Sequence, residues 1–336
     1  MPITDAPILV TGATGYVAAE IVRQLLDAGY RVRGTTRNVA KAEAEGHLTG
    51  LPGAVERLEL MEADLLEPGA FDEAVMGCDY VMHVASPYVI DVEDPQRDLV
   101  DPAVKGTRSV LASAAAVGTV KRVVLTSSFA AISGVPKDGV WTEEDWNETS
   151  SLGRSPYAYS KTLAERAAWE FVEATGIGLD LVVINPTGVI GPSVVPRLNQ
   201  SAALLVSLTT GEMPGIIDLS FPLVDVRDVA IAHIRAMESP GASGRYLCSA
   251  ESRNVRQIVE LARSAGIGDK YKLPRLSLDN PAGSALVRFV ANFQPKGTRA
   301  FLKRSLGATW RLDTSKIRRD LGIVFRDLDQ TIVEAL

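Results

Sequence analysis

The sequence predicts an α/β protein, in which helices cover both faces of a parallel β-sheet. Short apolar runs rich in valine, isoleucine and threonine alternate with longer segments of helical apolar spacing between residues 8 and 185. Because a helical segment follows each strand, successive strands are expected to pair in parallel through crossovers. The 336 residues are enough to bury a large core, as one enlarged domain or two unequal ones.

The first half of the chain carries the strands of this sheet. Strands are expected at Ile8–Thr11, Val32–Thr36, Val55–Leu60, Tyr80–His83, Val123–Thr126 and Leu181–Asn185. Helices are expected between them near 16–28, 38–48, 69–76, 96–117 and 156–175. Ligands of such sheets bind at the carboxyl ends of the strands, so the residues that follow each strand are the first candidates for a site.

The pattern changes after Asn185, where glycines and prolines interrupt the apolar runs. Helices are expected near 198–209, across Val226–Met237 and over 254–265, with one strand at Arg245–Cys248. We expect residues 186–336 to form mainly a smaller C-terminal lobe that caps the first, with segments near 223–250 returning to the large domain.

A glycine turn follows the first expected strand, in the stretch Thr11-Gly12-Ala13-Thr14-Gly15-Tyr16-Val17-Ala18. Gly12 permits a tight turn, Gly15 lets the backbone approach phosphate oxygens, and Ala18 lets the helix pack close to the strand. The helix N-terminus adds unpaired N–H groups and a positive dipole end. Such turns also have purely structural uses, but the motifs that follow favour a Rossmann-type, doubly wound dinucleotide-binding domain over residues 1–185.

Tyr157 and Lys161 lie four residues apart at the start of a long expected helix, so their side chains share one face. A phenol ionises near pH 10, and a nearby ammonium can lower that value by roughly one to three units. Tyr157 then becomes a usable acid for an alkoxide. Tyr159 has Leu163 at the matching position and lacks the lysine.

Thr126-Ser127-Ser128 ends another expected strand, about thirty residues before the tyrosine. A hydroxyl there could bind a substrate carbonyl and the Tyr157 oxygen, although serine after a strand is more often a turn former. Spacing does not decide between Ser127 and Ser128.

The second strand ends in Thr35-Thr36-Arg37, where NAD-binding domains carry a ribose-binding carboxylate. An arginine can instead pair with a 2′-phosphate, which favours NADP. Arg33 and Lys41 are possible helpers or plain surface cations. Asp64, in Asp64-Leu65 after the third strand, could meet the adenine amino group or cap a helix.

Composition excludes several partners. The net charge of −6, the pI near 5.3 and the lack of a basic block argue against nucleic acid and an anionic membrane surface. Cys78 and Cys248 lie far apart and are expected to be reduced, and no metal site is expected. His83 is expected to pack or hydrogen-bond. No signal peptide or spanning segment is found, so a cytoplasmic location is expected, and monomer and homodimer both stay open.

Taken together, these residues resemble the extended short-chain dehydrogenase/reductase family, in the branch of dihydroflavonol reductases, cinnamoyl-CoA reductases and microbial NADPH-dependent aldehyde or ketone reductases. The resemblance also rests on His83–Pro87, Asn185–Pro192, Val224–Ala230 and Gly244–Ser249. Two features differ from flavonoid reductases: the glycine motif ends in Ala18, and Ser133 stands where an asparagine is frequent. Both count against a dihydroflavonol substrate.

The resemblance implies a catalytic set of Ser128, Tyr157 and Lys161, with Ser128 preferred over Ser127. The residues that would bind NADP (NADPH) are Gly12, Thr14, Gly15, Tyr16, Val17, Arg37, Lys41, Asp64, Leu65, Val84, Ala85, Ser86, Thr126, Tyr157, Lys161, Pro186, Thr187, Gly188, Val189 and Ser201. The smaller lobe would bind the substrate. Candidates for an apolar wall, each also explained as ordinary core, are Tyr88, Phe129, Ile132, Ile190 and the segment 197–225.

The leading interpretation is therefore an NADPH-dependent reductase that converts a small aldehyde or ketone to an alcohol, with Tyr157 as proton donor and Ser128 holding the oxygen. A nucleotide-sugar epimerase or dehydratase of the same family is the alternative, and Arg37 counts against it because those enzymes retain NAD. A non-catalytic NADP-binding regulatory protein is a third interpretation. It is disfavoured because both the tyrosine and the lysine are present.

Overall fold

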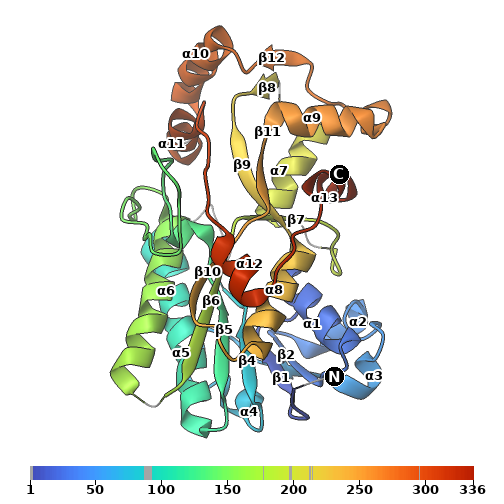
Figure 1. Cartoon of the computed structure of the whole chain (residues 1–336), viewed down its shortest axis with the longest axis vertical. Coiled ribbons are helices and arrows are strands. Elements are labelled where there is room, and N and C mark those ends of the chain that lie inside the picture. Colours follow the sequence, from blue (N-terminus) through green and yellow to red (C-terminus); the bar gives the residue numbers. More distant parts are fainter. Residues whose placement is uncertain are drawn as a thin grey trace.

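A seven-stranded sheet forms the centre of the larger lobe (Figure 1). The computed structural model describes residues 3–86, 93–176, 178–196, 199–211, 213, 215–294 and 296–336. The sheet runs in the order β10-β6-β5-β4-β1-β2-β3, and every neighbouring pair is parallel. The strands are β1 (Ile8–Val10), β2 (Val32–Thr36), β3 (Leu58–Glu62), β4 (Tyr80–His83), β5 (Arg122–Thr126), β6 (Asp180–Pro186) and β10 (Gly244–Cys248). The predicted doubly wound α/β fold is confirmed.

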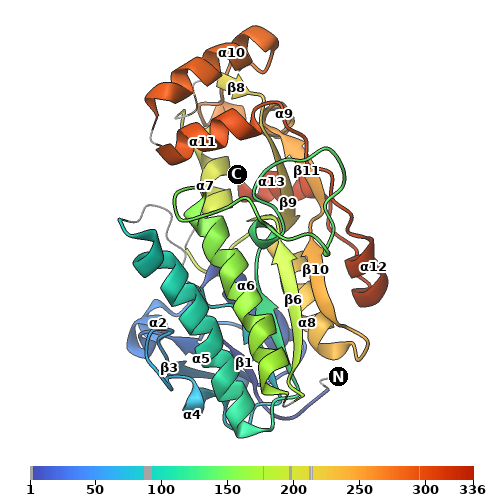
Figure 2. The ribbon, with the colours of Figure 1, turned by 90° about the vertical axis from the view of Figure 1, so that its left-hand side faces the viewer.

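Helices cover both faces of this sheet because successive strand residues point to opposite sides. Ile8 and Val10 are buried on the face of α1 (Tyr16–Asp27) and α8 (Val226–Glu238). Leu9 is buried on the other face, where α5 (Asp101–Val117) and α6 (Pro156–Thr175) run side by side (Figure 2). The near-continuous apolar strands of the sequence thus fill two cores at once.

Shorter elements connect these strands and helices. They are α2 (Val39–Glu45), α3 (Ala54–Arg57), α4 (Asp72–Val75), a π-helical turn η1 (Gln96–Val100) before α5, and a 3₁₀ turn η2 (Phe129–Ala131) after β5. The strand predicted at Val55–Leu60 is wrong at its start. Residues 54–57 form α3, with the Val55 side chain 91% exposed, and β3 begins at Leu58 because Leu58 pairs with Val32, the first residue of β2.

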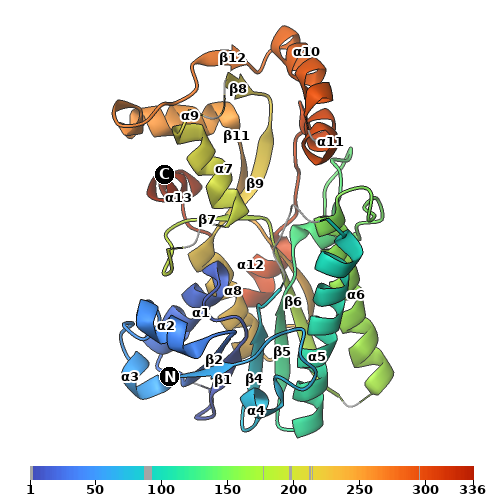
Figure 3. The same ribbon diagram turned by 180° about the vertical axis from the view of Figure 1, so that it is seen from behind.

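The smaller lobe holds two further sheets and lies above the carboxyl ends of the large sheet (Figure 3). One sheet has the order β11-β9-β7 and the other pairs β12 with β8. Its elements are β7 (Gly188–Ile190), α7 (Gln200–Thr209), β8 (Gly215–Ile217), β9 (Ser220–Asp225), β11 (Glu251–Asn254), α9 (Val255–Ser264), η3 (Ile267–Asp269), β12 (Leu276–Leu278), α10 (Pro281–Val290), η4 (Ala291–Phe293), α11 (Lys296–Ser305) and α13 (Leu328–Ala335). Helix α12 (Ser315–Leu321) instead buries Ile317 and Leu321 in the core of the larger lobe. The segment 226–248 contributes β10 to the large sheet and α8 to one of its faces. The domain boundary at residue 185 stays a prediction.

The sequence-based expectation covered few of the elements in the last third of the chain. Strands β11 and β12 and helices α10 to α13 were not expected from the apolar pattern. Several are short, and α10 leaves large apolar side chains exposed, so their spacing does not mark a buried face. Within the described residues, no helix combines the length and apolarity needed to cross a membrane. The expected cytoplasmic location stays a prediction.

Gly12 occupies the turn between β1 and α1, and the backbone there requires a glycine. Its φ is +65°, a conformation that residues with a side chain rarely adopt. A Cβ at this position would lie 3.0 Å from the Ala85 Cβ and 3.2 Å from the Ala85 Cα, in the loop after β4. The turn and that loop therefore approach each other closely because residue 12 has no side chain.

We expect Gly12→Ala to cost more free energy of unfolding than Gly46→Ala. Gly46 has a φ of +70°, but a Cβ there would meet open space, so its replacement carries the backbone strain alone, about 1–2 kcal/mol. Replacement of Gly12 adds a steric term of about 1–3 kcal/mol against Ala85. Urea unfolding of both variants measures the difference. Equal losses would contradict the close approach.

Candidate active site

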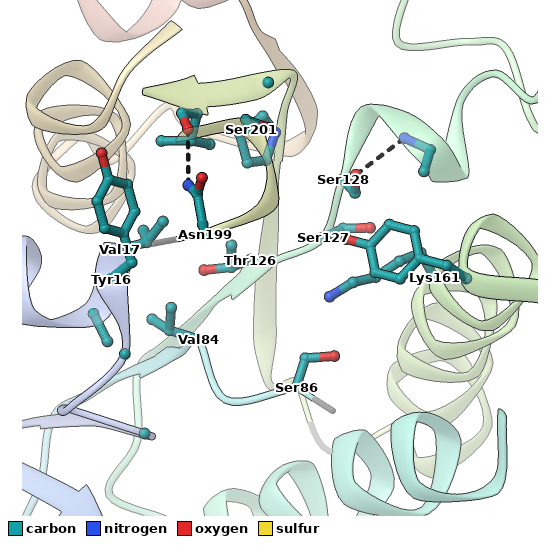
Figure 4. Close-up of a pocket in the computed structure, with 18 of the residues that line it drawn as sticks. Tyr16, Val17, Val84, Ser86, Thr126, Ser127, Ser128, Lys161, Asn199 and Ser201 are labelled. Carbon is teal, nitrogen blue, oxygen red and sulfur yellow. Dashed lines mark hydrogen bonds between the residues drawn. The ribbon is translucent and has the colours of Figure 1, made fainter. Parts of the chain in front are cut away.

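A cleft of about 1240 Å³ opens where strands β1, β2, β4, β5 and β6 end, below the smaller lobe. All residues predicted as catalytic or cofactor-binding lie in its lining: Gly12, Thr14, Gly15, Tyr16, Val17, Arg37, Lys41, Asp64, Leu65, Val84, Ala85, Ser86, Thr126, Ser128, Tyr157, Lys161, Pro186, Thr187, Gly188, Val189 and Ser201. Figure 4 shows Tyr16, Val17 and Val84 on one side, and Ser127, Ser128 and Lys161 on the other. Segments far apart in sequence thus meet in one cavity.

The glycine turn presents the N-terminus of α1 to this cleft. Gly15 is the N-cap residue and no side chain caps the helix, so its first-turn N–H groups face no side-chain acceptor. The turn is held in place because the Ala13 N–H donates to the Thr35 carbonyl over 2.8 Å. Uncapped N–H groups, a positive dipole end and glycine backbone fit a phosphate group.

Thr11 joins the glycine turn to the loop after β4, a role that the sequence did not reveal. Its Oγ1 accepts the Val84 and Ala85 N–H groups over 3.0 Å each and lies 2.9 Å from Nδ1 of His83. His83 is buried outside the cleft lining, and burial lowers its pKa to about 3, so the ring is neutral at pH 7. This matches the expected packing and hydrogen-bonding role.

The cations in and after β2 differ in their surroundings. Arg37 is exposed and lines the cleft, as does Lys41, whose Nζ lies 3.9 Å from Oε1 of Glu45. Arg33 points elsewhere: it pairs with Glu59 over 2.8 Å and lies outside the lining. Asp64 also lines the cleft, and its Oδ1 accepts the N–H of Leu66 over 2.9 Å, so it caps its own turn.

Tyr157 and Lys161 sit on the first two turns of α6. The Lys161 Nζ lies 5.9 Å from the centre of the Tyr157 ring, and both residues line the cleft. The lysine is 8% exposed, and burial lowers its pKa to about 8, although the Glu165 carboxylate acts in the opposite direction. The amine therefore still carries its proton at pH 7. Tyr159, the neighbouring tyrosine, is not part of the described lining.

Ser127 and Ser128 have different hydrogen bonds. The Ser127 hydroxyl is buried and donates to Oε2 of Glu165 over 2.5 Å. The half-buried Ser128 hydroxyl accepts the Ala130 N–H over 3.1 Å, which leaves its own hydrogen free to donate (Figure 4). Spacing could not separate the two serines, but their partners do.

Glu165 lies one turn after Lys161 on α6 and is 1% exposed. Besides Ser127, its carboxylate accepts Nδ2 of Asn185 over 2.7 Å and Nε of Arg245 over 2.5 Å. Asn185 also donates to the Ser128 carbonyl over 3.2 Å. Sequence reasoning missed this buried cluster. Its signal was an acidic residue four positions after the lysine, on the inner face of the predicted helix.

A second missed contact lies behind Thr126. Its Oγ1 is 2.6 Å from Nε2 of His233 on α8, and Nδ1 of the same ring lies 2.7 Å from the Val229 carbonyl. Burial lowers the pKa of His233 to about 4, so the ring is neutral at pH 7. A neutral ring that donates from Nδ1 to the carbonyl accepts the threonine hydrogen at Nε2. This pair fixes the rotamer of a residue in the cleft wall.

The loop after β6 closes the cleft from the side of the smaller lobe. Asn199 caps α7, and its Nδ2 donates to the Val189 carbonyl over 2.8 Å (Figure 4). Gly188, the first residue of β7, pairs with Leu223 of β9, and a Cβ at Gly188 would lie 2.9 Å from a Leu223 side-chain carbon. Residues 186–189 and Ser201 are thereby brought to the cleft.

Some of the candidates for the apolar wall line the cleft, whereas others lie in the core. Phe129 lines the cleft, as do Leu204, Leu205, Phe221, Pro222 and Leu223 from the segment 197–225. Ile132 and Ile190 are fully buried and outside the described lining, so they are core residues. Tyr88 lies outside the described residues. Phe301, Arg304 and Trp310 also line the cleft and were not foreseen.

Comparison with known proteins agrees with this geometry. The model of the NAD dependent epimerase/dehydratase family matches residues 8–276. Cinnamoyl-CoA reductase CAD2 of Medicago truncatula is 46% identical over 265 residues, which cover 76% of this chain and 79% of that protein. Dihydroflavonol 4-reductase of Zea mays is 38% identical over 263 residues, 76% of this chain and 73% of that protein.

Solved structures of reductases match almost the whole chain. Yeast methylglyoxal/isovaleraldehyde reductase Gre2, complexed with NADPH, has a TM-score of 0.80 and 30% identity, and the match covers 98% of this chain and 96% of that one. Gre2 from Candida albicans in complex with NADPH also has a TM-score of 0.80 and 30% identity, covering 98% and 97%. The resemblance stated from the motifs is confirmed.

We expect Glu165→Gln to lower the pKa of Lys161 further below about 8, because the carboxylate that raises it is gone. A carbon-13 NMR titration of the lysine Cε measures this directly. Arg245 also loses its anion, so the free energy of unfolding should fall by about 3–5 kcal/mol.

The matched control is Glu170→Gln, on the same helix. Glu170 is exposed and pairs only with Arg108 among the described residues, so the pKa of Lys161 should not move. A Lys161 titration unchanged in Glu165→Gln would show that the buried carboxylate does not act on the lysine.

Proposed function

The chain belongs to the NAD dependent epimerase/dehydratase family, within the extended short-chain dehydrogenases/reductases, and from this premise we propose that it is an NADPH-dependent reductase of aldehyde or ketone carbonyls. As a member of that family with reductase relatives it is an oxidoreductase. The proposal adds the cofactor, the substrate type and the residues that act. It is carried by one observation: Ser128, Tyr157 and Lys161 line the same cleft as the glycine turn.

The described residues fit NADPH. The uncapped N-terminus of α1 and the Gly12 turn, which a Cβ would obstruct, suit the pyrophosphate. Arg37 and Lys41 are cations that line the cleft. Neither these residues nor Asn38 carries a carboxylate, which would repel a 2′-phosphate. Residues 186–189 and Ser201 would hold the nicotinamide end. When bound, NADPH supplies the hydride that forms the new C–H bond.

The protein supplies the proton. Tyr157 would donate its phenolic hydrogen to the carbonyl oxygen as that oxygen gains negative charge, and so complete the alcohol. The Lys161 ammonium, protonated below about pH 8, stabilises the phenolate left behind. Ser128 would donate a hydrogen bond to the carbonyl oxygen and hold it in place, because its hydroxyl hydrogen has no acceptor among the described residues. Ser127 is unsuited because it already donates to Glu165.

The same geometry weighs against the other interpretations. A nucleotide-sugar epimerase or dehydratase that retains NAD would be expected to carry a carboxylate after β2, where this cleft has Thr36, Arg37 and Asn38. A non-catalytic binding protein would not need the buried lysine next to the tyrosine. We further propose that the partner is a small carbonyl compound and that the protein is cytoplasmic.

We expect Tyr157→Phe to lower kcat for NADPH-dependent carbonyl reduction by roughly a hundred- to ten-thousandfold, because the proton donor is lost. NADPH binding, followed by fluorescence titration, should change little. Tyr159→Phe is the matched control and should keep full activity, since Tyr159 lies outside the described lining. Turnover near wild type in Tyr157→Phe would refute the proton-donor role.

We expect Arg37→Asp to weaken NADPH binding by roughly ten- to hundredfold while NADH binding changes much less, because only NADPH carries the 2′-phosphate. Arg31→Asp makes the same charge change at an exposed position outside the cleft lining and should leave both affinities unchanged. Titration calorimetry with each nucleotide provides the test. Equal losses for the two nucleotides would remove the phosphate role.

A further inference from the structure

The smaller lobe contributes an apolar wall with one cation to the cleft. Its described lining side chains are apolar or uncharged, among them Leu204, Leu205, Phe221, Ile258, Phe301 and Trp310, and the exception is Arg304. Ligand pockets are commonly built this way, with an apolar surface for the body of the ligand and few polar groups that fix its orientation. The position of Arg304 therefore bears on which substrates are accepted.

Arg304 reaches across from α11 to the start of the catalytic helix. Its Nη2 donates to Oγ of Ser155 over 3.0 Å, and Ser155 also lines the cleft, two residues before Tyr157. Figure 2 shows α11 above the N-terminal end of α6. Ser155 has a φ of 60°, the one described non-glycine residue with a positive value. Such strain persists where the surrounding structure holds it, often at functional sites.

The segment of the chain that carries Arg304 is rich in basic residues. The segment 281–312 contains six basic residues and no aspartate or glutamate, in a chain whose net charge is −6. These cations are spaced along α10, α11 and the following loop, so they form no consecutive block. Burial lowers the pKa of Arg304, and the positive charge of Arg154, next to Ser155, lowers it further. A planar guanidinium suits a carboxylate, which it can bind through two parallel hydrogen bonds.

Resting on the proposed function, we propose that Arg304 recognises a carboxylate on the substrate, so that the enzyme prefers carbonyl compounds with an apolar body and a free acid group. The carboxylate binds the guanidinium beside Ser155, and the apolar body lies against Phe221, Leu205 and Trp310. The carbonyl then faces Tyr157, and the carboxylate is unchanged by the reaction. Arg304 acts on specificity and takes no part in proton transfer.

The test compares phenyl oxo acids of increasing chain length with their methyl esters as substrates with NADPH. The wild-type protein should reduce at least one acid with a higher kcat/KM than its ester, mainly through a lower KM. Arg304→Gln should lower kcat/KM for that acid roughly ten- to hundredfold and change the ester by less than about threefold. Arg304→Lys keeps the charge and should restore part of the preference.

Lys303→Gln is the matched control. It removes a charge from the same helix, but Lys303 is exposed, lies outside the cleft lining and donates to Oδ1 of Asn292. It should leave the acid preference unchanged. A readout without turnover is calorimetric binding of the saturated phenylalkyl carboxylates, which have no carbonyl to reduce. The wild-type protein should bind them, and Arg304→Gln should lose roughly tenfold or more in affinity.

The outcomes separate the two proposals. Equal losses for acid and ester in Arg304→Gln would mean that Arg304 only joins α11 to Ser155, and would overturn the inference. Reduction of the esters at least as well as all the acids by the wild-type protein would overturn it too, while the proposed function stands. If no carbonyl compound is reduced, the proposed function fails, and the binding titration alone decides whether Arg304 recognises a carboxylate.

Discussion

The buried carboxylate of Glu165 is the constraint on which the arrangement of the site depends. An ionised group that is 1% exposed must be paired and hydrogen-bonded, and here it receives a hydroxyl, an amide and a guanidinium. These partners come from the end of β5, from β6 and from β10. One side chain thus connects three neighbouring strands to α6, which carries Tyr157 and Lys161.

The same interaction connects geometry with electrostatics. Burial alone moves the Lys161 pKa toward neutrality, and an amine that lost its proton could no longer stabilise a phenolate. The carboxylate one turn further along the helix opposes that shift, so a buried lysine keeps its charge at neutral pH. Glu165 accepts the hydroxyl hydrogen of Ser127, so Ser128 is the serine whose hydroxyl hydrogen can be donated to a ligand. Of this network only Ser127 lines the described cleft; Glu165, Asn185 and Arg245 lie behind the lining.

The cleft has two unlike halves because two lobes build it. The Rossmann side supplies backbone N–H groups, glycine turns and cations, which suit a dinucleotide with phosphate groups. The smaller lobe supplies a mainly apolar surface with the single described cation Arg304. Their meeting at the carboxyl edge of the sheet would bring the proposed hydride donor and carbonyl substrate to Tyr157. Under the proposed function, the sheet side would bind the cofactor and the smaller lobe would set substrate preference.

Many secondary-structure elements and site residues of this protein could be predicted from local sequence patterns. Strand β4 and helix α6 have the expected bounds. Apolar runs and helical spacing predict an element well where it is buried on both faces or where its ends carry clear sequence signals. The error at Val55 arose because a β-branched residue was counted as strand, whereas pairing with β2 starts β3 three residues later. The predicted site residues share one cleft because carboxyl ends of parallel strands share one edge.

The sequence by itself thus determined the parallel sheet, the glycine turn and the tyrosine–lysine helix, since each depends on residues close together in the chain. Only the tertiary structure distinguished Ser127 from Ser128, revealed Glu165 between Asn185 and Arg245, and brought Arg304 to Ser155. Those contacts join residues that are 20 to 149 positions apart. No local pattern encodes them, because they exist only once the sheet and the capping lobe have packed together.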